Sequence, residues 1–245
     1  MTDLVERVRV ALRDHVGPAM GLDADEMVVV AVEDGIASMR LAGACASCPA
    51  TIPMLLTGLA LFDTSAPETA VSGRLETLSD QLSTLLPGFQ TAARSARRPD
   101  RAVFVGSGPL AYAAREAALK VMELSAGQIP ALWDSSLGFR HGPKSFVLPG
   151  TDIWVFASAD PQTRAYDADL IAELRQQFPG STVTAPVVPQ PFGDLWSVPL
   201  YIALAQIMAV VWSDALGLPV DDPFAGQGTL SRVVSGVTLH PVVPK

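Results

Sequence analysis

The sequence predicts an α/β fold built on a doubly wound parallel sheet, and three observations lead to this prediction. Short apolar runs such as 102–105 and 153–158 lack polar alternation, which is typical of strands buried on both faces. Helical patterns stand between these runs, and strands that alternate with helices indicate parallel βαβ connections. The first run breaks into Gly106-Ser107-Gly108-Pro109, a strand–loop–helix signal in which Pro109 suits the first helical position.

The remaining elements of this region follow at short intervals. The run at 199–216 is the most apolar of them, and we expect a buried helix that packs on the sheet or between subunits. Its apolar core, 200–211, is too short for a membrane span. The patterns predict a helix at 75–86 that stops at Pro87-Gly88, a second helical piece to Arg94, a helix from Pro109 to Leu124, strands at 128–133 and 181–184, and a helix at 166–178.

The first 62 residues have a different pattern. An amphipathic helix is expected at 3–20, and two strands at 27–32 and 36–41 are joined by an Asp-Gly hairpin signal. Cys45 and Cys48 follow, before a further apolar helix. Two thiolates at this spacing can hold a soft metal or part of a cluster, but they supply two ligands, so a full site needs a partner chain. A redox pair and two small buried residues in a turn are the alternatives.

This opening resembles the C-terminal domain of NifU-type iron–sulfur cluster assembly proteins over about residues 1–60. The shared order is helix, hairpin, Gly43-Ala44-Cys45-x-x-Cys48-Pro49 and helix. The resemblance implies a small α+β segment with an iron–sulfur cluster at Cys45 and Cys48. Two positions depart from that family, because Gly21-Leu22-Asp23 replaces a Gly-Gly-Asp and Pro53 interrupts a stretch of small polar residues.

Composition narrows the classes of function. The chain has 245 residues and a formal charge of −8, and no basic run appears, which argues against a nucleic-acid partner. The first residues show no apolar signal region, so a cytoplasmic location without a membrane partner is expected. Two cysteines do not make a disulfide framework.

Four separated motifs in the rest of the chain carry a second resemblance. They are the strand–Gly106-Ser107-Gly108–helix unit, the segments 118–124 and 137–145, and the tail 228–238. Together they resemble the second SIS (sugar isomerase) domain of the AgaS family, which comprises tagatose-6-phosphate ketose/aldose isomerases and galactosamine-6-phosphate deaminases, over about residues 75–245. The expected organisation is a NifU-like segment at 1–62, a linker with helices at 63–99 and an SIS domain at 100–245.

The SIS resemblance implies the residues of a site that needs no cofactor. Glu123 would shuttle the proton between two sugar carbons, His141 would open the ring, and Lys120 would lend a supporting charge. Arg232 stands where a related synthase has a tail lysine, and an arginine cannot form an imine. From residue types alone, Glu116 and Lys120 would be a surface ion pair. The expected substrate-binding residues are Ser107, Gly108, Arg140, Lys144, Ser158 and Thr163.

One expected part of a two-SIS enzyme is missing from the sequence. No Ser-x-Ser-Gly-x-Thr-like run, which would grip a phosphate at a helix start, occurs before residue 100. Either a second chain in a homo-oligomer supplies that grip, or the catalytic residues lack a competent site. The expected function is therefore an AgaS-like sugar-phosphate isomerase or deaminase. The alternatives are a non-catalytic sugar-phosphate-binding module and an iron–sulfur scaffold or carrier.

Overall fold

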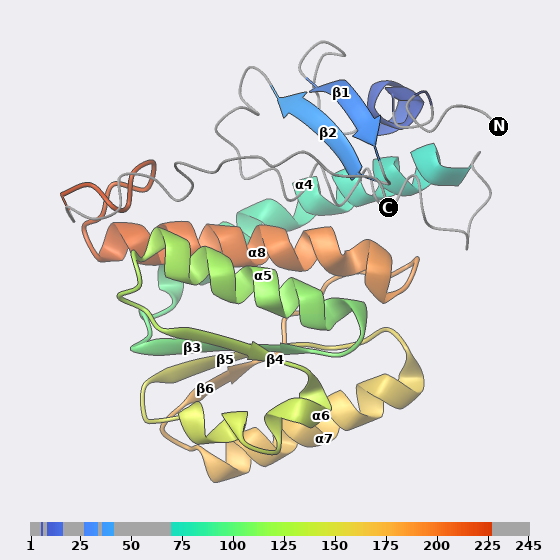
Figure 1. Cartoon of the computed structure of the whole chain (residues 1–245). Coiled ribbons are helices and arrows are strands. Elements are labelled where there is room, and N and C mark those ends of the chain that lie inside the picture. Colours follow the sequence, from blue (N-terminus) through green and yellow to red (C-terminus); the bar gives the residue numbers. More distant parts are fainter. Residues whose placement is uncertain (1–5, 7–8, 17–26, 34–35, 42–69, 227–245) are drawn as a thin grey trace. The chain divides into compact units, whose positions relative to one another are not determined.

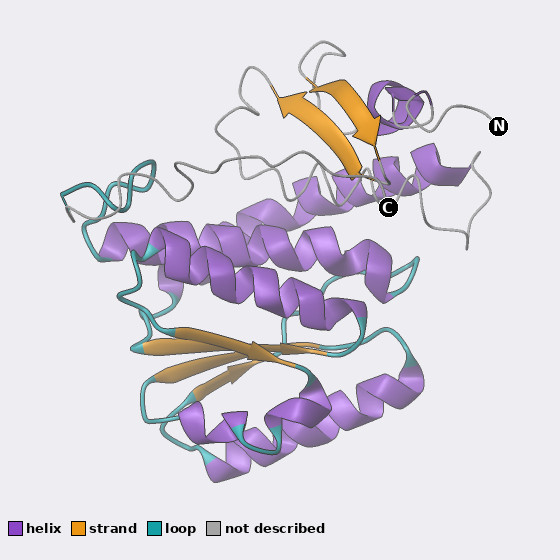
Figure 2. Cartoon of the chain, in the orientation of Figure 1, coloured by secondary structure: helices purple, strands orange, loops and turns teal. Residues whose placement is uncertain are grey.

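The computed structural model of the chain describes residues 6, 9–16, 27–33, 36–41 and 70–226 (Figures 1 and 2). The chain divides into two compact units, one of residues 1–83 with 237–245 and one of residues 84–236. Cys45, Cys48, Arg232 and the tail motif at 228–238 lie outside the described residues.

The first unit contains the hairpin that the sequence predicts. Strands β1, Met27–Glu33, and β2, Ile36–Leu41, pair antiparallel, with Met27 opposite Leu41 and Glu33 opposite Ile36. The described residues before β1 include the π-helix η1, Ala11–Val16, inside the predicted helix 3–20. The predicted order of helix and antiparallel hairpin is therefore confirmed within the described residues.

Helix α4, Val71–Ser95, corrects one prediction. The sequence predicts two helical pieces separated at Pro87-Gly88, but the chain forms a single helix with Pro87 inside it. Proline removes one backbone hydrogen bond, because it has no N–H to donate to the preceding turn. Leu75, Leu78, Phe89 and Ala93 are buried on both sides of Pro87, and this burial offsets the lost bond.

The second unit is built on a parallel sheet of four strands. These are β3, Arg101–Gly106, β4, Ala131–Asp134, β5, Thr151–Phe156, and β6, Thr182–Thr184, in the order β4-β3-β5-β6. The chain leaves β3 for β4 on one side and returns to β5 on the other, so the direction of winding reverses between β3 and β5. Loops at such a switch point are the usual ligand site of open α/β sheets.

Helices cover both faces of this sheet (Figure 1). Helices α5, Pro109–Leu124, and α8, Asp194–Ala215, lie on one face, while α6, Ser136–Phe139, and α7, Pro161–Gln177, lie on the other. Side chains of β3 point alternately to the two faces of the sheet, and Val103 and Val105 pack into the core on the face that α7 covers. The predicted doubly wound α/β fold is confirmed.

Two helices begin earlier than the sequence predicts. Helix α7 begins at Pro161 rather than Tyr166, because the side chain of Asp160 accepts a hydrogen bond from the backbone N–H of Thr163 and caps the helix. Helix α8 begins at Asp194 and contains Pro199, which was the expected start. A proline this close to the first turn costs one backbone bond, and α8 tolerates it because nearly every residue from Trp196 to Ala205 is buried.

Helix α8 is long and apolar enough to cross a membrane, judged by its 22 residues and a mean hydropathy of 1.7 alone. In the structure 72% of this apolar window is buried, and α8 lies beside α5 against the sheet (Figure 1). Tyr201 of α8 stacks on Phe156 of β5 with ring centroids 4.5 Å apart, so α8 serves as a core helix of this unit.

Candidate active site

Helix α5 carries a compact cluster of one cation and two carboxylates. The Nζ atom of Lys120 lies 2.7 Å from Oε2 of Glu123 and 3.4 Å from Oε1 of Glu116. The side chain of Lys120 is 8% exposed, whereas that of Glu123 is 17% exposed. The predicted ion pair of Glu116 with Lys120 is present, but it is not a surface pair, because the lysine is buried. A carboxylate that a buried ammonium orients, and that solvent still reaches, can exchange a proton with a bound substrate.

His141 lies in the turn between α6 and the 3-10 helix η4, Pro143–Phe146. Its backbone N–H donates to the carbonyl of Gly138 over 3.1 Å, and the residue is exposed. Within residues 70–226 the imidazole makes no hydrogen bond and no ion pair in this structure. The orientation of His141 therefore depends on how the chain on either side of it is held.

One chain does not bring His141 to Glu123. Glu123 belongs to α5, and His141 follows α6, which lies on the opposite face of the sheet (Figure 1). The helix that carries Glu123 and the helix that precedes His141 are therefore separated by the sheet of the second unit.

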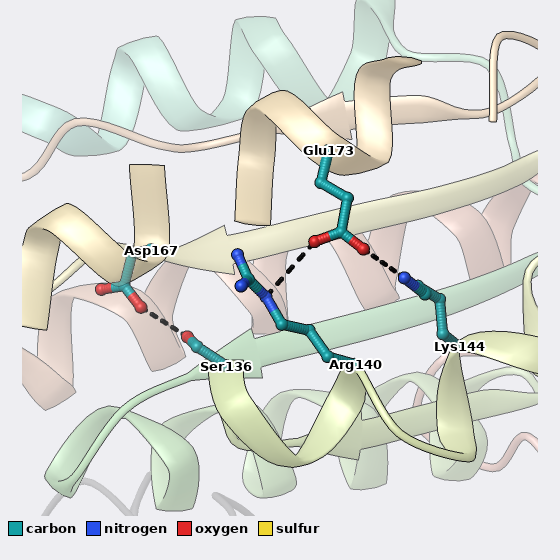
Figure 3. Close-up of polar contacts among 5 residues, drawn as sticks. All are labelled: Ser136, Arg140, Lys144, Asp167 and Glu173. Atoms are coloured by element: carbon teal, nitrogen blue, oxygen red, sulfur yellow. Dashed lines mark hydrogen bonds and ion pairs between the residues drawn. The ribbon is translucent and has the colours of Figure 1, made fainter. Parts of the chain in front are cut away.

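Arg140 and Lys144, which flank His141, both point to one acidic residue on α7 (Figure 3). Nε of Arg140 lies 3.4 Å from Oε2 of Glu173, and Nζ of Lys144 donates to Oε1 of the same carboxylate. The hydrogen bond from Lys144 lowers the pKa of Glu173, and the positive charges of Lys144 and Arg140 act in the same direction. Glu173 was not predicted, since a glutamate on an exposed helical pattern has no local signal for a partner 29 residues away.

A second acidic residue of α7, Asp167, joins three loops at the carboxyl edge of the sheet. Its Oδ1 atom accepts hydrogen bonds from the hydroxyls of Ser107, over 3.1 Å, and Ser136, over 2.5 Å. Its Oδ2 atom accepts the backbone N–H of Ser158 over 2.9 Å. These serines follow β3, β4 and β5 respectively, and Asp167 is fully buried. Asp167 thus fixes the loops on both sides of the switch point.

A third carboxylate completes this arrangement. Asp194, the first residue of α8, accepts the hydroxyl of Ser158 and the backbone N–H of Ala159, both over 2.5 Å. The hydroxyls of Ser107 and Ser158, which the sequence analysis expects to bind substrate, thus donate to carboxylates in this structure. A phosphate that bound the hydroxyls of Ser107 and Ser158 would have to break these hydrogen bonds. The carboxylates of Asp167 and Asp194 would also repel its negative charge.

The other two residues expected to bind substrate lie at helix starts. The backbone N–H of Thr163 donates to Oδ1 of Asp160 over 2.8 Å, and this bond lowers the pKa of Asp160. Gly108 has a φ of 54°, in the left-handed region that favours glycine, and it precedes α5. A side chain at Gly106 would collide with the carbonyl of Leu110, which would lie 2.5 Å from the added carbon, so the strand-to-helix turn needs glycine there.

The structure thus groups the predicted residues in three clusters: Lys120 with Glu123, Arg140 with Lys144 through Glu173, and Ser107 with Ser158 through Asp167. His141 stands apart from the first cluster. Among the described residues, no group of three or more His, Cys, Asp or Glu side chains is placed to hold a metal ion.

The fold defines a class, the parallel-sheet α/β fold of SIS proteins, and comparison with solved structures supports it. Tagatose-6-phosphate ketose/aldose isomerase from Escherichia coli superposes with a TM-score of 0.63 and 34% identity, over 77% of this chain and 52% of that one. Glucosamine-6-phosphate deaminase from Thermotoga maritima has a TM-score of 0.53 at 22% identity, which supports the fold alone.

Sequence comparison identifies particular relatives. D-galactosamine-6-phosphate deaminase AgaS of Escherichia coli is 39% identical over 207 residues, which cover 77% of this chain and 53% of that protein. The AgaS protein of a Shewanella species is 42% identical over 148 residues, or 58% of this chain and 38% of that protein. No protein-family model matches. The chain is therefore homologous to AgaS proteins, and it spans about half the length of the relatives from Escherichia coli.

Proposed function

We propose that the chain is an AgaS-like enzyme, a sugar-phosphate ketose/aldose isomerase or an amino-sugar-6-phosphate deaminase. The observation that supports this proposal is the buried contact of Lys120 with Glu123, 2.7 Å long, in a chain homologous to proteins named for those activities. The chemistry is acid–base catalysis by Glu123 and His141, and the SIS site uses no cofactor. Because the chain spans only about half the length of its Escherichia coli relatives, their activity and substrate class are proposals for this protein.

The proposed reaction begins with ring opening. His141 moves a proton from the anomeric hydroxyl to the ring oxygen, so that the bond between C1 and the ring oxygen breaks and an aldehyde forms. Glu123 then takes the proton from C2, and the electron pair forms a double bond between C1 and C2, which leaves on O1 a negative charge that the ammonium of Lys120 stabilises. A proton passes from the hydroxyl or amino group on C2 to O1, and Glu123 returns its proton to C1. A 2-hydroxy sugar becomes a ketose, whereas a 2-amino sugar becomes an imine that water hydrolyses to a ketone and ammonia.

The proposed site is shared between two copies of the chain in a homo-oligomer. Helix α5, which carries Glu123, and helix α6, which precedes His141, lie on opposite faces of one sheet, so we infer that a substrate takes the two groups from different copies. Coexpression of the variants Glu123→Gln and His141→Asn is expected to restore part of the turnover that each lacks alone, because mixed oligomers contain sites with both groups intact. Sedimentation should show a dimer or larger species. A strict monomer, or mixed oligomers as inactive as either parent, would contradict the shared site.

The first test of the function is a thermal-shift and turnover assay with galactosamine-6-phosphate and tagatose-6-phosphate. A higher melting temperature together with turnover is the expected result, since a ligand that binds the folded state stabilises it. Stabilisation without turnover would favour the alternative of a non-catalytic sugar-phosphate-binding module. No response to either sugar would contradict both proposals.

A second candidate function is an iron–sulfur scaffold or carrier that uses Cys45 and Cys48. The antiparallel pairing of β1 with β2, just before the cysteines in sequence, supports it because the NifU resemblance requires that order. Reconstitution with iron and sulfide should give a brown protein, and the colour should be lost in Cys45→Ser. A protein that stays colourless would remove this candidate.

A further inference from the structure

The segment that carries His141 is attached to one helix at both of its ends (Figure 3). At its start, the hydroxyl of Ser136 donates to Asp167 over 2.5 Å. At its end, Arg140 and Lys144 contact the carboxylate of Glu173 from two sides. Both acceptors belong to α7, so α7 is the support on which this segment lies.

This segment depends on such contacts because its own helices are too short to hold their shape. Helices α6 and η4 have four residues each, far fewer than an isolated helix needs in water. The segment's apolar anchors are Phe139, which is fully buried in one cluster with Leu170 and Leu174 of α7, and Val147, which is buried in the same cluster at the far end of the segment. Between these anchors His141 and Gly142 are exposed, and the contacts of Arg140 and Lys144 with Glu173 are the ion pairs that hold this turn to α7.

We propose that Glu173 is the positioning residue for His141. The cations on either side of His141 converge on the two oxygens of one carboxylate, which fixes both ends of the turn without a contact to the imidazole. The lowered pKa of Glu173 is consistent with a carboxylate that stays charged at neutral pH. The inference rests on the proposed role of His141 in ring opening.

A consequence concerns the two cations themselves. The sequence analysis expects Arg140 and Lys144 to bind the substrate, whereas their side chains, 28% and 19% exposed, point to Glu173. In the proposed arrangement Arg140 and Lys144 act on His141 through Glu173. Replacing either cation changes the position of His141 more than it changes the affinity for the sugar phosphate.

The first experiment measures the turn itself and needs no turnover. Hydrogen exchange of residues 136–147 and the NMR signal of the His141 imidazole are compared in the wild-type protein and in Glu173→Gln. We expect faster exchange confined to this segment and a displaced His141 signal. The matched control is Asp169→Asn, which removes an exposed carboxylate from the same helix and should change neither. If Glu173→Gln leaves exchange and signal as in the wild type, the proposal is wrong, whatever the enzyme's activity.

The second experiment separates positioning from substrate binding. Glu173→Gln should lower kcat on the order of tenfold to a hundredfold with little change in KM, since a displaced catalytic group costs rate more than affinity. Glu173→Asp, which keeps the charge, should recover part of this loss. Lys144→Gln combined with Glu173→Gln should be no slower than Glu173→Gln alone, because both remove the same contact.

The kinetic results can contradict the positioning role of Glu173 without contradicting the proposed enzyme activity. A higher KM in Lys144→Gln that adds to the effect of Glu173→Gln would assign Lys144 to the substrate and contradict its action through Glu173. If the wild-type protein turns over neither sugar, the proposed function fails, while exchange and NMR still decide whether Glu173 positions the turn.

Discussion

Replacement of Glu123 by glutamine is expected to abolish isomerisation while sugar-phosphate binding persists. The amide keeps the shape of the carboxylate and can still accept a bond from Lys120, but it cannot take a proton from C2. General acid–base groups contribute about a hundredfold to ten-thousandfold in rate, so a loss of that order in kcat is expected. Turnover of tagatose-6-phosphate and calorimetric binding of the same sugar are the two measurements.

The matched control for this prediction is Glu116→Gln. Glu116 lies one turn before Lys120 on α5, at a longer distance of 3.4 Å, and this variant leaves the contact between Lys120 and Glu123 in place. It should retain most of the turnover. Unchanged turnover in Glu123→Gln would remove Glu123 from the mechanism. Equal losses of turnover in Glu123→Gln and Glu116→Gln would mean that the enzyme needs the negative charge of the cluster, not Glu123 as a specific base.

Replacement of Asp167 by alanine is expected to have the largest effect on stability. It leaves three donors without their acceptor: the backbone N–H of Ser158 and the hydroxyl of Ser136, which are buried, and the hydroxyl of Ser107, which is half-buried. Buried polar groups left unpaired cost about 1–3 kcal/mol each, and hydroxyls can turn to other acceptors, so a loss of about 3 kcal/mol is expected. The free energy of unfolding in urea, compared with that of the wild type, measures this effect.

A smaller change at the same place gives the control for Asp167. Ser107→Ala removes one of the three donors and leaves the carboxylate with the other two, so about 1 kcal/mol should be lost. If Asp167→Ala unfolds no more easily than Ser107→Ala, then Asp167 does not hold the three loops together.

The sequence predicts the sheet well because buried strands leave a local pattern. The apolar runs at β3 and β5 and the glycines after β3 are enough to indicate the strand–loop–helix unit and the winding of the chain. The single helix α4 was missed because the prediction weighed the missing N–H of Pro87 and not the buried side chains on either side of it.

The candidate site is predicted only in part, for a physical reason. Glu123 and Lys120 are three residues apart on one helix, so their meeting can be inferred from helical spacing. Asp167, Asp194 and Glu173 meet their side-chain partners across 29 to 60 residues, and Asp167 also accepts the backbone N–H of Ser158, nine residues before it. No spacing rule connects an aspartate of one helix with serines of three separate loops. These three carboxylates can therefore be identified only from the folded structure.

Helix α8 also bears on how the chain is made. Its apolar surface would attract chaperones or a translocation channel if it left the ribosome with nothing to cover it. Synthesis proceeds from the N-terminus, so α5 and β5, which α8 contacts, have already emerged when Asp194 does. Because of this order of elements, the surface on which α8 packs is synthesised before α8 itself. A circular permutation that moved α8 ahead of β3 would reverse that order and expose the nascent chain to aggregation.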